Sequence, residues 1–165
     1  MAPEREAFAL WRHSSFVERW CGCPGHGAAT THETCTRCKA GIVESLNEVV
    51  ATAIVKIRSG GEVDGRFLVA RLDESRMDET MARDELFNSL ALAVARQFQS
   101  GLIDYYEGDE ITNALWWLML ETSIAPIAFA VYEAFDTGEF DRGDGVDRVK
   151  EFTVPMIRAI LAANS

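Results

Sequence analysis

The chain has 165 residues, of which 48% are apolar, so it is long enough to fold as one domain around its own core. Its formal net charge of −10 is unevenly placed, because residues 1–60 carry six acids and seven bases whereas residues 61–165 carry twenty acids and nine bases. This acidity disfavours broad nucleic-acid binding and favours basic partners.

The first ten residues mix charged and apolar side chains and lack the uninterrupted apolar run of a signal peptide. We therefore expect a cytoplasmic protein, whose thiols stay reduced and bind metal rather than form disulfides. Residues 3–20 predict an amphipathic, partly helical segment, and a strand over residues 15–21 is the alternative. Its bulky apolar residues are Phe8, Trp11, Phe16 and Trp20.

All four cysteines lie within one short stretch, as Cys-x-Cys, eleven intervening residues and Cys-x2-Cys. This spacing predicts a tetrahedral Zn²⁺ site. Four thiolates leave no open coordination position, so we expect structural rather than catalytic zinc. An iron–sulfur cluster and a pair of disulfides are the alternatives. The predicted ligands are Cys21, Cys23, Cys35 and Cys38, and either His26 or His32 could replace one cysteine.

Beyond the cysteines, apolar residues at intervals of three and four predict a helix over residues 42–58, with Gly41 at positive φ before it. The alternative is a small β-hairpin, in which a strand from Val50 pairs with residues 66–72 across a turn at residues 59–61. Ser75-x-x-Asp78 resembles a capping box and predicts a helix that ends at Gly101.

The most apolar segment predicts one helix that begins after its N-cap Asp109 and runs to about Phe135, before Gly138 ends it. Pro126 should kink this helix. The segment is nearly long enough to span a bilayer, but its acidic flanks without a Lys or Arg anchor favour a buried helix at the centre of a bundle. Thr153 is the predicted N-cap of a last helix, with Pro155 in its first turn.

These elements predict a mainly α fold of orthogonal or bundled helices, with an N-terminal four-cysteine zinc-binding lobe over residues 1–41 and a helical domain over residues 42–165. A small β-hairpin within the lobe is an option. No membrane-spanning segment is expected.

Carboxylates are the other candidate metal ligands. Glu110 and Glu121 are eleven residues apart, which places them on one face of a helix, and Glu107 and Glu133 lie near them in sequence. No bundle helix carries the Glu-x-x-His motif of di-iron proteins. An acidic loop could hold Ca²⁺, but its order differs from that of an EF-hand. We therefore expect solvated or helix-capping roles for these acids. The loop's acids are Asp136, Glu139, Asp141, Asp144 and Asp147.

No nucleophile, phosphate-binding or dinucleotide motif is present in the sequence. We therefore expect a non-catalytic accessory protein that binds or regulates a basic protein partner, through the aromatic residues of the lobe and an acidic face from Asp104 to Glu151. One alternative is an acidic nucleic-acid mimic that inhibits a DNA-binding protein. Another is a metal-dependent nucleotide hydrolase that uses Glu107, Glu110 and Glu121.

Overall fold

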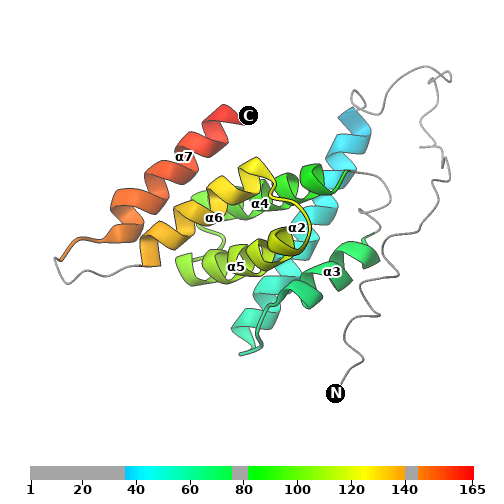
Figure 1. The fold of residues 1–165 in the computed structure, drawn as a ribbon, viewed down its shortest axis with the longest axis horizontal. Coiled ribbons are helices and arrows are strands. Elements are labelled where there is room, and N and C mark those ends of the chain that lie inside the picture. Colours follow the sequence, from blue (N-terminus) through cyan, green and yellow to red (C-terminus); the bar gives the residue numbers. More distant parts are fainter. Residues whose placement is uncertain (1–35, 76–81, 140–144) are drawn as a thin grey trace. The chain divides into compact units, whose positions relative to one another are not determined.

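Helices make up most of the chain in the computed structural model, which describes residues 36–75, 82–139 and 145–165 (Figure 1). Within these three ranges the chain forms six α-helices, one π-helical turn and no strand. The predicted mainly α fold is therefore confirmed. The predicted zinc lobe, except for the residues at its C-terminal edge, lies outside the described residues. Residues Lys39–Ser165 form one unit by their mutual contacts.

Helix α2 (Thr36–Arg58) begins earlier than predicted and includes Gly41, so the expected positive φ at Gly41 is wrong. Gly60, at φ 80°, ends α2, and the next amide, that of Gly61, donates to the carbonyl of Lys56 at 2.9 Å. Helix α3 (Gly65–Glu74) follows, with Asp64 as its N-cap. The hairpin alternative for this region is wrong, because both of its predicted strands are helical.

Helix α4 (Arg83–Gln99) starts later than predicted, because Ser75 caps the C-terminus of α3 instead of opening the next helix. Its end is as predicted. Gly101 has φ 74°, and the amide of Leu102 donates to the carbonyl of Gln97 at 3.0 Å. This six-to-one hydrogen bond closes a Schellman motif, which a glycine in the left-handed region permits without strain.

The predicted single helix after Gly108 is wrong, because the chain forms α5 (Tyr105–Glu121) and α6 (Pro126–Glu139) with a break between them. Asp104, rather than Asp109, caps α5. Pro126 begins α6 instead of kinking a longer helix, as its fixed φ and missing N–H allow. Gly138 lies inside α6 and does not end it. In the described residues, no helix is both long enough and apolar enough to cross a bilayer.

Helix α6 lies at the centre of the helical unit and packs against α4, α5 and the C-terminal segment (Figure 1). Helices α5 and α6 run antiparallel, since the Tyr105 hydroxyl at the start of α5 donates to the carbonyl of Phe135 near the end of α6 at 2.7 Å. The ring of Phe135 is fully buried and packs against Phe98. Gly108 makes room for it, because a Cβ there would lie 2.4 Å from Cε1 of Phe135.

The C-terminal segment consists of a π-helical turn, η3 (Val149–Thr153), that continues directly into α7 (Val154–Ala163). Thr153 occupies the N-cap position of α7, as predicted, but its side chain does not cap the helix. It has helical backbone angles and is fully buried. Pro155 lies in the first turn as predicted, and Ile157 packs into the core.

Candidate functional site

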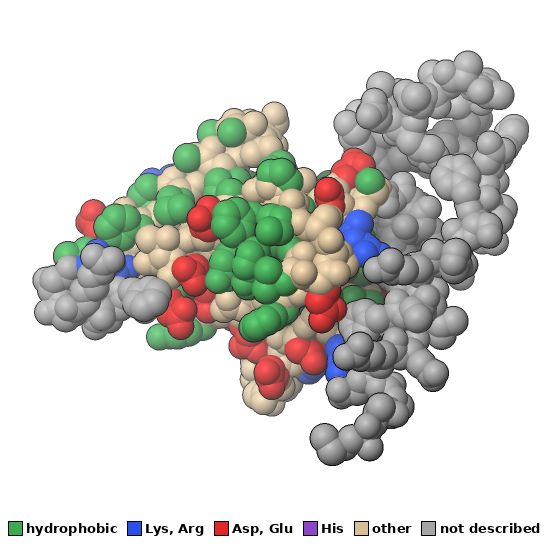
Figure 2. Space-filling view, viewed as in Figure 1, with side chains coloured by type: hydrophobic (Ala, Val, Ile, Leu, Met, Phe, Trp, Pro, Cys, Tyr) green, Lys and Arg blue, Asp and Glu red, His purple; other side chains and the backbone are tan. Residues whose placement is uncertain are grey.

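Large apolar side chains are exposed to solvent on α5 and on its connection to α6. Trp117 is 66% exposed, Leu120 50% and Ile124 53%. Leu120 is three residues after Trp117 and four after Trp116, so it lies beside both on the surface of α5. Hydrophobic side chains gather over α5 and α6 at the middle of the face in Figure 2. We name this surface the apolar patch, and its members are Trp116, Trp117, Leu120, Ile124, Phe129 and Tyr132.

The aromatic members of the apolar patch hold one another across the two helices. The ring of Trp116 from α5 stacks on Tyr132 from α6, with centroids 4.9 Å apart and planes at 10°. Phe129 packs against both rings, at 5.5 Å from Trp116 and 6.3 Å from Tyr132. All three rings are half-buried. Their mutual contacts fix the aromatic part of the surface before any partner binds, so little side-chain freedom remains to be lost there.

Three carboxylates form an acidic cluster next to the apolar patch, and its members are Asp109, Asp136 and Glu139. Burial, together with the charges of Glu139, Asp136 and Glu110, raises the pKa of Asp109 to about 6. The amide of Asn113 donates to Asp109 at 3.0 Å and partly opposes this shift in the pKa. The partly buried Asp109 therefore lies within electrostatic reach of Asp136 and Glu139.

Tyr132 joins the apolar patch to the acidic cluster. Its ring belongs to the aromatic stack, and its hydroxyl donates to Oδ1 of Asp136 at 3.2 Å. Burial and the neighbouring Asp136 raise the pKa of this hydroxyl, so it remains a donor at neutral pH. One surface therefore offers apolar contact and, beside it, a concentration of negative charge.

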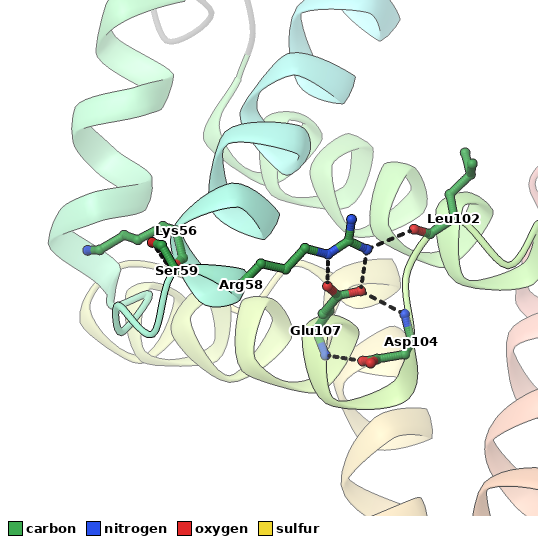
Figure 3. Close-up of polar contacts among 6 residues, drawn as sticks. All are labelled: Lys56, Arg58, Ser59, Leu102, Asp104 and Glu107. Carbon is green, nitrogen blue, oxygen red and sulfur yellow. Dashed lines mark hydrogen bonds and ion pairs between the residues drawn. The ribbon is translucent and has the colours of Figure 1, made fainter.

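A separate polar contact fastens α2 to α5. Arg58 ends α2, and its Nε donates to Oε1 of the buried Glu107 at 2.5 Å (Figure 3). Glu107 also accepts from the backbone amide of Asp104 and completes the capping box of α5. Hydrogen bonding from Arg58 lowers the pKa of Glu107. Each oxygen of this carboxylate already has a partner, which indicates a structural role.

The structure does not bring the proposed hydrolase residues into one site. Glu110 Oε1 accepts from the backbone amide of Val63 at 3.0 Å, and Glu121 is exposed at the far end of α5. Eleven residues of helix separate Glu110 and Glu121 by about 16 Å along the axis, too far for both to bind one ion. In the ranges that the structure describes, no group of three or more His, Cys, Asp or Glu residues could hold a metal ion.

Among the predicted zinc ligands, Cys38 is within the part of the chain that the structure describes. Cys38 lies in the first turn of α2. In the acidic loop, Oδ1 of Asp147 accepts from the amide of Lys150 at 3.1 Å, which is a helix-capping contact. Outside the described residues lie Cys21, Cys23, Cys35, His26, His32, Asp141, Asp144, Trp11, Phe16 and Trp20.

Sequence reasoning missed the apolar patch because it assigned the α5 residues to a helix buried on all sides. The available signal was the sequence Thr-Ser-Ile-Ala-Pro at 122–126, in which two polar residues precede a proline suited to a first helical turn. Such a break creates two shorter helices, and each of them has a face that the other cannot cover.

Comparisons with protein-family models, curated proteins and solved structures find no match. The candidate site therefore rests on the geometry of this chain.

Proposed function

We propose that this chain is a non-catalytic binding protein that holds another protein on its apolar patch. The observation that carries the proposal is the exposure of Trp117 and Leu120, one turn apart on α5, and of Ile124 in the connection that follows. Contiguous exposed apolar side chains are typical of interaction sites, and tryptophan and tyrosine contribute disproportionately to binding energy. The acids around the patch would form its polar rim, in the usual arrangement of a protein interface.

The test is capture of a partner from the source cells with three full-length, tagged proteins. These are the wild type, the patch variant Trp117→Ser/Leu120→Ser, and the control Val43→Ser/Val55→Ser, which removes two exposed apolar side chains from α2. We expect the wild type and the control to retain the same protein and the patch variant to lose it by about tenfold or more. Equal retention by all three folded proteins would contradict the proposal.

We further propose that the four cysteines bind one structural Zn²⁺ at the N-terminal side of α2. The support is their spacing, together with the absence of any cysteine from residues 39–165, so that the helical core does not depend on a thiolate. Elemental analysis should find about one zinc per chain, and Cys21→Ser/Cys23→Ser should lose it. Circular dichroism after chelation should retain the helical signal, whereas global loss of helix would contradict this two-part organisation.

A further inference from the structure

The α5–α6 hairpin carries negative charge without positive charge of its own. Between Asp104 and Glu139 the sequence contains eight acidic residues and no Lys, Arg or His. Glu107 is neutralised from outside this segment, by Arg58 of α2. The charge next to the apolar patch therefore strongly favours a cationic ligand over an anionic one. The eight acids are Asp104, Glu107, Asp109, Glu110, Glu121, Glu133, Asp136 and Glu139.

The acidic cluster lies next to the aromatic part of the apolar patch. Asp136 accepts a hydrogen bond from the hydroxyl of Tyr132, and the ring of Tyr132 stacks on Trp116. Asp136 and Glu139 lie close enough to Asp109 for their charges to raise its pKa. A cation that reached these carboxylates would relieve their mutual repulsion. A ligand lying on the aromatic stack would thus have its cationic group within reach of the cluster.

A second copy of this chain fits the surface poorly. In a two-fold dimer the same patch lies on both sides of the interface, so each acidic cluster would approach the rim of an equally acidic neighbour. Like charges at an interface cost affinity. The same argument disfavours a nucleic acid, since its phosphates would meet eight acids.

We propose that the occupant of the apolar patch is a basic amphipathic segment of another protein, whose apolar side chains cover Trp117, Leu120 and Ile124 while a Lys or Arg beside them pairs with the acidic cluster. This inference rests on the proposed binding function and specifies the chemistry of its partner. Asp136 is the central receptor for the cationic group, because it lies next to the aromatic stack.

The test uses a fluorescein-labelled, 14-residue helical peptide of Leu and Lys and measures its affinity for the full-length protein by fluorescence anisotropy. Asp136→Asn/Glu139→Gln removes two charges from the cluster and keeps an acceptor for the Tyr132 hydroxyl. Glu44→Gln/Glu48→Gln is the matched control, because it removes two exposed charges from α2. We expect the cluster variant to raise the Kd by about tenfold or more and the control by less than about threefold.

The patch variant Trp117→Ser/Leu120→Ser distinguishes failure of the proposed binding function from failure of the basic-segment inference. It should also weaken binding by about tenfold. If the patch variant weakens binding and the cluster variant does no more than its control, the basic-segment inference fails while the binding function stands. If neither variant differs from the controls, both fail. A peptide of Leu and Glu that binds as tightly as the peptide of Leu and Lys would also overturn the inference. So would sedimentation analysis that shows a wild-type dimer and a monomeric Leu120→Ser variant.

Discussion

The guanidinium of Arg58, at the end of α2, meets the carboxylate of Glu107, in the first turn of α5, through two hydrogen bonds of 2.5 and 3.2 Å. A third bond joins Glu107 to the amide of Asp104. The positive side chain also lies at the C-terminus of α2, where it favourably opposes the helix dipole. This contact, between residues 49 apart in sequence, therefore joins α2 to α5 and fixes the start of the hairpin that carries the apolar patch.

Glu107→Gln should destabilise the protein at neutral pH and have progressively less effect in acid. The pKa of Glu107 is lowered in the folded state, so its stabilising contribution is present above the unfolded value of about 4.3 and is lost as pH falls through the folded pKa. Thermal unfolding from pH 7 to pH 3 measures this difference, with Glu48→Gln as the exposed control. A gap between wild type and variant that stayed constant with pH would contradict the account.

Asp109→Asn should have the opposite pH dependence. Because the folded pKa is about 6 and the unfolded pKa about 3.9, the wild-type residue favours folding at low pH and this contribution is lost as pH rises through 6. The variant keeps a polar group for Asn113 and removes the charge. We expect its melting temperature to exceed that of wild type by a few degrees at pH 7.5, and the advantage to vanish near pH 4. No gain at pH 7.5 would show that the acidic cluster is well solvated.

Gly108→Ala should lower the free energy of unfolding by about 1–3 kcal/mol, because the new methyl group would overlap the buried ring of Phe135. Gly41→Ala is the matched control. Nothing lies within 4 Å of the position of its Cβ inside α2, so it should stabilise the protein by about 0.5–1 kcal/mol. Urea unfolding measures both values. Equal effects of the two substitutions would contradict the close packing of α5 against α6.

Local patterns in the sequence predicted which segments are helical, and which face of a helix is buried, better than they predicted where each helix begins. The three- and four-residue spacing of Leu46, Val50 and Ala53 predicted the buried face of α2, and all three residues are in the core. Gly101 ended α4 as expected, because a glycine at positive φ is a local requirement of that turn. Such features depend on residues that are close in sequence.

The errors arose where distant residues decide between similar local patterns. Asp104 and Asp109 are both good N-caps, and Asp104 caps α5 because Glu107 then pairs with Arg58 from another helix. The break before Pro126 is stabilised by Asn88 of α4, whose Oδ1 accepts from the amides of Ile127 and Ala128 at 2.9 and 3.0 Å. Periodicity alone could not predict these contacts, and the exposed apolar patch follows from them.

Site-specific photo-crosslinking tests the central claim most directly. A photoreactive benzoylphenylalanine replaces Trp117 in the apolar patch, and a second protein carries it at Val55, which is equally exposed on α2. After irradiation in the source cells, position 117 should give one discrete adduct with another protein, and position 55 should not give it. The captured protein should contain a basic amphipathic segment at the crosslinked site. The same adducts from both positions, or none from position 117, would contradict the assignment of the α5–α6 surface as a protein-binding site.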